Sequence, residues 1–455
     1  MSACRRVAVT SACTLWLACA ATASYAQSAA EWQALQTAAA TKSDKIMAEA
    51  QANKGLLGQY IVMRRAYTSD NSPAFRLIFG QYISWYQSFL GDYVDAMKSF
   101  SIAPPPQQDD SPSPLSDDNY TARPAVTAIP QLAKNYRIVL FNEAHNIALT
   151  RSLTVQLLSA LREEGFNYFA AETLVQSDTG LASRGYATDN SGFYTEEPIY
   201  AEMVRTALKL GFKVVAYEAT SSNASGDTRE AEQARHIYEQ VFEHDPHARL
   251  VINAGYEHVV KSGAYLGGTS MAEHLYKLTQ APMLSVEQTM MYPHPSERDD
   301  HPYYVAIMKK LQPDAPIVFV NAAGKPWSLR AGYDVSVFFP PEKIVRGRPT
   351  WLALGGLRRA QRIDAGHCGE RYPCLVEARY SDEGPDAMPA DRMLLEQVPL
   401  SVSVSQVALY SSTQGIPSSD LYLRPGKYEL DFVGSNDRIL HKEELVVPSQ
   451  PEKPN

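Results

Sequence analysis

Cysteine is scarce in this 455-residue sequence, which contains only five. Three of the five lie within the first 19 residues, so only Cys368 and Cys374 serve the body of the protein. A zinc site built on two cysteines needs two further ligands, and His367 is the only candidate in the local segment HCGERYPC. We therefore expect Cys368 and Cys374 to close a small disulfide loop, as close pairs do in an oxidising compartment.

Positive charge is also in short supply. The sequence has 42 Lys and Arg against 50 Asp and Glu, which gives a net charge of −8, and no long basic run occurs. Nucleic-acid binders and proteins that dock on anionic membranes both need a basic surface. The charge balance therefore predicts a protein that does not bind nucleic acid.

Several catalytic motifs and a membrane span are missing as well. The sequence has no Walker A loop and no H-E-x-x-H zinc helix. It also has no G-x-S-x-G elbow, and this absence disfavours a serine hydrolase. Apolar residues recur at helical spacing over residues 75–97, but Arg76, Gln81 and Asp92 interrupt them. This stretch therefore predicts a packed helix rather than a transmembrane one.

The start of the chain has the layout of a secretory signal peptide. Arg5 and Arg6 precede an apolar stretch over residues 7–21, and SYA at 24–26 gives a small-x-small cleavage site. We therefore expect the first 26 residues to be removed and the mature protein to be periplasmic or secreted. A lipoprotein anchor at Cys19 is disfavoured by the residues that precede it, and a retained membrane anchor is the remaining alternative.

Changes in composition divide the rest of the chain into four regions, since it is too long for one ordinary core. Residues 27–102 are expected to be helical. Residues 103–122 are rich in Pro, Ser and Asp and predict a linker with little fixed structure. Residues 123–347 alternate strand and helix patterns. Residues 348–455 are β-rich, with an alternating run SVSVSQVALYSS and a turn at PG between two strands.

The central region predicts the fold class. Short apolar runs alternate with amphipathic helical stretches, which implies a mostly parallel sheet with helices on both faces. The fold is thus α/β, preceded by a helical segment and followed by a small β-sandwich-like domain. The apolar runs are RIVLF (137–141), NYFAA (167–171), KVVAY (213–217), RLVINA (249–254), PMLSV (282–286) and PIVFVNA (316–322).

Ionisable side chains follow almost every one of these runs. Ligands of open parallel sheets bind beyond the carboxyl ends of the strands, which share one edge. A cluster of carboxylates and histidines is costly there unless it holds a metal, a cation or a reacting group. We therefore expect a functional site. The side chains concerned are Glu143, His145, Glu172, Glu218, Glu257, His258 and Glu287.

Two residues at the start of a later helix are expected to join this site. Arg229 could orient a glutamate or hold an anionic intermediate beside Glu230, although an ordinary exposed pair is the alternative. His236 lies two turns along the same helix and is expected at the surface. Six further histidines follow no strand and are not expected to be ligands. They are His244, His247, His274, His294, His301 and His441.

At these residues the sequence resembles the superfamily of the erythromycin esterases, the ChaN-like haem-binding lipoproteins and the Tiki/TraB metalloproteases. FNEAHN at 141–146 resembles its first motif, AAETL carries Glu172, DTREAEQARHI carries Arg229 and Glu230, and NAGYEHV carries Gly255 and His258. The resemblance covers residues 126–345. It departs from the family pattern at Asn142, where the family has glycine and where we expect a residue that tolerates positive φ.

The resemblance implies either hydrolysis at a Glu/His site or haem binding at the same edge. In the first hypothesis, Glu172 or Glu143 is the general base for hydrolysis of an ester, lactone or peptide. His145, Glu172 and His258 then position the water or bind Mn, Co or Zn, with Arg229 steadying negative charge. The partner is a small molecule or a peptide. In the second hypothesis, an exported haem- or iron-binding protein uses Tyr217 or Tyr256. An inactive scaffold and a site without any cofactor are further alternatives.

Overall fold

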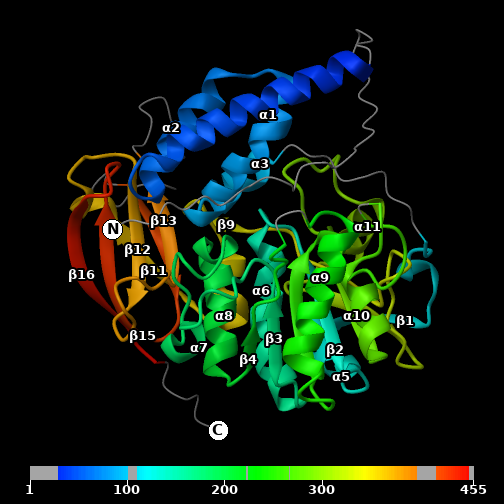
Figure 1. The fold of residues 1–455 in the computed structure, drawn as a ribbon. Helices are drawn as coiled ribbons and strands as arrows, with labels where there is room; N and C mark the ends of the chain where they lie inside the picture. Colours follow the sequence, from blue (N-terminus) through cyan, green and yellow to red (C-terminus); the bar gives the residue numbers. More distant parts are fainter. Residues whose placement is uncertain (1–28, 101–109, 222–223, 266, 397–416, 450–455) are drawn as a thin grey trace.

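The computed structural model describes residues 29–100, 110–221, 224–265, 267–396 and 417–449 (Figure 1). The expected signal peptide, residues 103–109 of the expected linker and the SVSVSQVALYSS run lie outside the described residues. Among the helices of the described ranges, none combines the length and apolar character that a membrane span requires.

An eight-stranded sheet forms the centre of the molecule, with strand order β1-β7-β8-β6-β2-β5-β3-β4. All strands run the same way except β7, which is antiparallel to both of its neighbours. The strands are β1 (Tyr120–Pro124), β2 (Ile138–Glu143), β3 (Tyr168–Ala171), β4 (Lys213–Val215), β5 (Leu250–Gly255), β6 (Met283–Met291), β7 (Ile317–Asn321) and β8 (Val335–Phe338).

Helices cover both faces of this sheet because its buried strands are apolar on both sides. In β2, Val139 and Phe141 face one apolar core, and Ile138 and Leu140 face another. Helices α5 (Ala125–Ala133), α6 (Ala148–Glu163) and α8 (Pro198–Lys209) complete the first core, and α9 (Asp227–Ile237) and α10 (Met271–Thr279) complete the second. The short α7 (Leu181–Arg184) and α11 (Pro302–Leu311) complete the domain.

The predicted α/β class with a mostly parallel sheet is confirmed, and all six apolar runs form strands. Two strands of this sheet, β1 and β8, were not predicted from the sequence. Strand β1 lies at the sheet edge and is largely exposed, so it carries no apolar alternation, and β8 has only four residues. The last predicted run, β7, is antiparallel rather than parallel.

The expected linker differs from the prediction over its described part. The backbone N–H of Asp110 donates to the carbonyl of Leu329 at 3.1 Å, and the indole Nε1 of Trp327 donates to the carbonyl of Pro112 at 3.0 Å. Residues 120–122 belong to β1. This stretch has fixed structure because an adjacent loop and strand satisfy its backbone groups.

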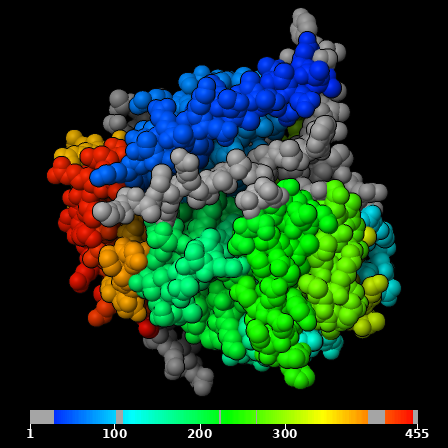
Figure 2. Space-filling view, in the orientation of Figure 1, coloured from blue at the N-terminus to red at the C-terminus, as the bar shows by residue number. Residues whose placement is uncertain are grey.

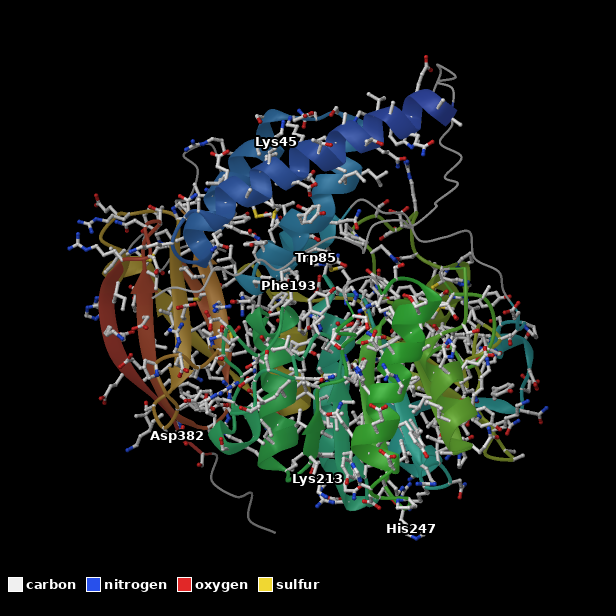
Figure 3. All side chains as sticks on the ribbon, in the orientation of Figure 1. Lys45, Trp85, Phe193, Lys213, His247 and Asp382 are labelled. Atoms are coloured by element: carbon white, nitrogen blue, oxygen red, sulfur yellow. A yellow bond between two sulfur atoms is a disulfide. The ribbon has the colours of Figure 1, made fainter. Side chains whose placement is uncertain are left out.

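The N-terminal region is helical, as predicted, and lies across the carboxyl edge of the sheet (Figures 1 and 2). In Figure 3, Trp85 of α3 meets Phe193 at this edge, whereas Lys213, the first residue of β4, and His247, which precedes β5, lie at the opposite edge. The helices are α1 (Ala29–Gln51), α2 (Leu56–Ser69), α3 (Pro73–Phe89) and α4 (Tyr93–Ser99). We call these four helices the helical layer.

The C-terminal region forms small antiparallel sheets. Strands β11 and β14 pair with each other, and β13-β12-β15-β16 form a second sheet, with one apolar core between them. A disulfide joins Cys368 and Cys374, as predicted. The turn at Pro425-Gly426 joins β14 to β15 and therefore crosses between the two sheets. The strands are β9 (Ile344–Val345), β10 (Arg348–Pro349), β11 (Arg359–Asp364), β12 (Cys374–Tyr380), β13 (Asp391–Leu395), β14 (Ser418–Leu423), β15 (Gly426–Val433) and β16 (Ile439–Val447).

Candidate active site at the carboxyl edge of the sheet

The site residues expected from the sequence come together at the carboxyl ends of β2, β3, β4 and β5. They form two groups on either side of Gly255, the last residue of β5. The backbone N–H of Gly255 donates to Oε2 of Glu172 at 2.6 Å, and a Cβ on Gly255 would overlap the ring of His145. Glycine is required here because His145 and Glu172 both lie against its backbone.

The first group consists of Glu143 and His145. Arg151 of α6 donates two hydrogen bonds to the Glu143 carboxylate, both at 2.7 Å, and Asn253 of β5 donates a third at 2.6 Å. Nδ1 of His145 lies 3.2 Å from Oε1 of Glu143. Burial alone would raise the pKa of Glu143, but Arg151 and His145 outweigh burial and lower it to about 2. Glu143 is therefore an ionised acceptor.

An ionised Glu143 fixes the tautomer of His145. The carboxylate can only accept, so Nδ1 of His145 carries a hydrogen, and in the neutral ring Nε2 is the nitrogen with the lone pair. The ring stacks on Tyr194 at 4.3 Å between centroids and meets Tyr256 edge-on at 5.1 Å. The His145 side chain is 14% exposed. This arrangement is typical of a general base that a carboxylate orients.

The second group consists of Glu172, Arg229, Glu230 and His258. Nδ1 of His258 lies 2.7 Å from Oε2 of the fully buried Glu230, and Nε2 lies 3.3 Å from Oε1 of Glu172. Arg229 donates to the same Glu172 oxygen at 3.1 Å. Glu172 is thus held by two cations and by the backbone of Gly255. His258 and Arg229 outweigh the effect of burial and hold its pKa well below the ordinary value.

Glu218 lies at the outer side of this group. Its Oε1 accepts from Nε of Arg229 at 3.1 Å and from Nε2 of Gln233 at 2.8 Å. Glu218 is 23% exposed and Arg229 is 26% exposed, whereas Glu172 and His258 are each 5% exposed. A ligand therefore reaches this group from the side of Arg229 and Glu218.

Two strand-end carboxylates of the sequence argument are placed differently. Glu287 lies inside β6, which continues to Met291, and it is fully buried beside Asn142 and Thr289. Glu257 pairs with Arg330 instead of joining either group. Asn142 is a strand residue of β2 and does not have positive φ, so the expected turn conformation is wrong.

His236 is not the surface residue expected from its position on α9. Its side chain is 12% exposed, and Nδ1 lies 3.0 Å from the carbonyl oxygen of Glu218. His236 therefore contacts the backbone that follows β4 and helps to hold Glu218 in place.

Several residues that build the site were missed by the sequence argument. Arg151 and Asn253 hold Glu143, Tyr194 stacks on His145, and the hydroxyl of Tyr265 lies 3.4 Å from Nε2 of His258. A polar Asn253 within the apolar run RLVINA was a signal, since a buried strand residue of this kind needs a polar partner. Arg151 and Tyr194 had no comparable signal in the sequence.

The residues of the expected metal set do not converge on one ion. Within the described ranges, His145, Glu172 and His258 do not offer three ligand atoms that all lie within 4.8 Å of one another. The guanidinium of Arg229 already contacts Glu172, Glu218 and His258. This permanent cation already pairs with two of the three expected ligands, Glu172 and His258, and a resident metal at these residues stays a prediction.

The tyrosines named for haem binding are not placed as open ligands. Tyr217 is fully buried in the core under α9 and α10, and Tyr256 is partly buried against His145. Two concavities, of about 750 and 500 Å³, lie away from both groups. The first is lined by Tyr168, Lys213 and their neighbours at the amino ends of β3 and β4, and the second lies between α9 and α10. Haem binding stays a prediction.

His258 gives the free energy of unfolding a defined pH dependence. Burial alone would lower the pKa of His258, but Glu172 and Glu230 outweigh burial and raise it from 6.5 to about 10. A group with a higher pKa in the folded state stabilises fully below its unfolded pKa and stops doing so as the pH rises through the folded one. We therefore expect this contribution to decline between about pH 6.5 and about pH 10.

Urea unfolding at both ends of this pH window tests the prediction. In His258→Gln the contribution is absent, so stability should fall less with pH than in the wild type. The matched variant His247→Gln, at the opposite edge of the sheet, should keep the wild-type dependence. An identical pH dependence in His258→Gln and the wild type would contradict a charged, paired His258.

Comparisons with known proteins do not assign a family. No protein-family model matches the chain, and no curated protein matches it. Among solved structures, the type III effector HopBA1 is 10% identical over 50% of this chain and 99% of that one, with a TM-score of 0.31. RRSP, a MARTX toxin effector domain from Vibrio vulnificus CMCP6, is 16% identical over 48% and 46%, with a TM-score of 0.28. A structure titled as bacterial protein toxins is 18% identical over 48% and 47%, with a TM-score of 0.29.

Proposed function

We propose that this chain is a hydrolase that acts at the carboxyl edge of its sheet, with His145 as the general base. The observation that carries the proposal is the orientation of His145. Its Nδ1 faces the ionised Glu143, and its Nε2 forms no hydrogen bond with the described residues. Nε2 also lies beside Gly255, on the side where Glu172 contacts the same backbone, and Glu172 in turn pairs with Arg229 and His258.

The chemistry follows from these positions. Nε2 of His145 takes a proton from water while the water oxygen attacks the carbonyl carbon of the substrate. Arg229 and protonated His258 supply positive charge near the developing oxyanion. When the bond to the leaving group breaks, His145 returns its proton to the leaving oxygen or nitrogen. The same scheme applies to esters, lactones and peptides, which are the substrate classes proposed for this exported chain.

Glu143 and Glu172, each considered from the sequence as the base, suit this role less well. Glu143 is fully buried and its oxygens accept from Arg151, Asn253 and His145. Glu172 is held by two cations and has a lowered pKa, so it is a weak base. We assign Glu143 to orienting His145, and Glu172 to holding Arg229 and His258 in place.

A hydrolysis panel tests the proposal. The exported chain is incubated with aryl esters, lactones and short peptides, with and without EDTA, and released acid is measured. We expect turnover of at least one class, no inhibition by EDTA, and no turnover by a parallel His145→Ala preparation. Absence of turnover by folded wild type in every class, or equal turnover by His145→Ala, would contradict the proposal.

The helical layer contributes to the position of His145. Trp85 of α3 contacts Phe193 at 5.5 Å and Tyr194 at 6.4 Å between ring centroids, and Tyr194 stacks on His145. Trp85 thus supports the catalytic histidine through one intervening ring, without touching it.

We expect Trp85→Ala to lower kcat by about tenfold or more, because a displacement of ~1 Å at reacting groups can cost ~10²-fold. Trp85→Phe should recover most of the rate, since it keeps a ring against Phe193. Tyr276→Ala, which removes a 47% exposed ring elsewhere, serves as the control. Wild-type kcat in Trp85→Ala would show that the helical layer does not position His145.

A further inference from the structure

The C-terminal region contains a second group of histidine and carboxylate side chains, far along the chain from the candidate active site. His441 and Glu443 lie two residues apart on β16, the edge strand of the four-stranded sheet. Side chains two apart share a face of a strand. His441 pairs in register with Phe432 and Glu443 with Leu430, and both of these β15 residues are fully buried. The two polar residues therefore lie on the core-facing side of an edge strand, where apolar residues are the rule, and Glu443 remains 35% exposed there.

His367 reaches this group from a separate segment. It belongs to a short 3-10 turn, Ala365–Cys368, which the disulfide between Cys368 and Cys374 ties to β12. The carboxylate of Asp364 accepts the backbone N–H of Gly366 at 2.8 Å and fixes the start of this turn. His367 is thus presented to β16 by a covalently anchored loop.

The three side chains converge. Nε2 of His367 lies 3.5 Å from Oε2 of Glu443, and the rings of His367 and His441 lie 3.8 Å apart with an interplanar angle of 8°. One ligand atom from each of the three lies within 4.8 Å of the other two. Within the described ranges, no other set of three His, Cys, Asp or Glu side chains meets this condition.

The donor set fits a divalent transition metal. Two imidazole nitrogens and one carboxylate oxygen are ordinary ligands of Zn²⁺, with bonds of ~2.0–2.2 Å in a tetrahedral arrangement that keeps ligand atoms roughly 3.4 Å apart. The ring of Phe432 meets both His367 and His441 edge-on, at 5.4 and 5.8 Å, and gives the group an apolar floor. His367 is 48% exposed and has room to turn, so that its lone pair and that of His441 meet at one point.

A simple ion pair explains less of this arrangement. Inward-facing charges on an edge strand protect it from pairing with other chains, and Glu443 alone would serve that purpose. A Glu443–His367 pair does not require a second imidazole stacked on the first. Binding of an ion accounts for all three side chains and for the anchored loop.

We propose that His367, His441 and Glu443 bind one divalent transition metal ion, which clips the disulfide loop to the edge strand β16. The fourth coordination position is open to water. This proposal departs from the sequence expectation that His441 is not a ligand, and it does not depend on the proposed hydrolysis at the carboxyl edge of the sheet.

Zinc titration of the full chain tests this site. The chain is treated with EDTA, dialysed and titrated with Zn²⁺ alone, by calorimetry and by competition with a chromogenic chelator. We expect one equivalent of Zn²⁺ to bind and to raise Tm. Because loss of an outer partner of a metal ligand already weakens binding by ~10–100-fold, His367→Ala, His441→Ala and Glu443→Gln should each weaken it by at least about tenfold.

Two further variants separate this site from others. His247→Ala removes an exposed histidine elsewhere, and His145→Ala removes one at the carboxyl edge, so both should bind Zn²⁺ as the wild type does. The proposal is overturned if the wild type binds no Zn²⁺. It is equally overturned if His367→Ala and His441→Ala bind Zn²⁺ with wild-type affinity, because the ion then lies elsewhere.

Discussion

His145→Ala is expected to lower kcat/KM by at least ~10²-fold, the lower limit of what a positioned general base contributes. Glu143 orients the ring through Nδ1, and Tyr194 stacks on it. An alanine side chain has no nitrogen to replace Nε2 of this oriented ring. Arg229 and His258 remain in place, which leaves the binding of a negatively charged or polar substrate group largely intact. The loss is therefore expected mainly in kcat.

The variant should remain folded, although the His145 side chain is only 14% exposed. The substitution removes a hydrogen bond to an ionised carboxylate, which costs about 1.5–3 kcal/mol of unfolding free energy. His247→Ala is the matched control and should keep wild-type kcat/KM and stability. A loss of less than tenfold in folded His145→Ala would assign the base to another group.

Glu202→Gln is expected to lower the free energy of unfolding by about 3–5 kcal/mol, as found when one partner of a buried ion pair is removed. Glu202 of α8 is 1% exposed and lies 3.2 Å from Arg358 and 3.4 Å from Arg205, and it also accepts from Arg424. Burial alone would raise the pKa of Glu202, but Arg358 and Arg424 outweigh burial and lower it to about 2.

This network joins the α/β region to the C-terminal sheets, because Arg358 and Arg424 flank β11 and β14. Glutamine keeps the shape of Glu202 but leaves the arginines without their buried carboxylate. Glu239→Gln breaks a largely exposed pair with Arg235 and should change stability by less than about 0.5 kcal/mol. Urea unfolding followed by circular dichroism measures both. A loss of under 1 kcal/mol in Glu202→Gln would mean that water or another anion replaces the carboxylate.

The sequence was sufficient to predict which residues meet at the carboxyl edge. Glu143, Glu172, Glu218 and His258 each follow a buried apolar run, and parallel strands bring such positions to one edge whatever the details of packing. The same rule was wrong for Glu287, because β6 continues for five residues beyond the apolar run PMLSV. Strand ends are set by backbone pairing with neighbours, which composition does not reveal.

The roles within the site depended on directions that the sequence does not contain. Arg151 lies on a helix whose sequence is ordinarily amphipathic, yet it donates two hydrogen bonds to the Glu143 carboxylate. Glu143 paired in this way is a poor general base. Arg229 was expected to steady a glutamate, and it does contact Glu172 and Glu218. That its guanidinium pairs with two of the three expected metal ligands, Glu172 and His258, follows only from three-dimensional geometry.

Imidazole rescue of His145→Ala tests the central claim most directly. The cavity left by the ring lies between Tyr194, Tyr256 and Gly255 and retains Glu143 as an acceptor. We expect added imidazole to restore hydrolysis by His145→Ala in a saturable way, by at least about tenfold of the ~10²–10⁴-fold that a general base supplies. N-methylimidazole, which cannot donate to Glu143 while keeping a free nitrogen, should rescue less. If imidazole binds in the cavity without raising the rate, His145 is not the base and the account of this site is wrong.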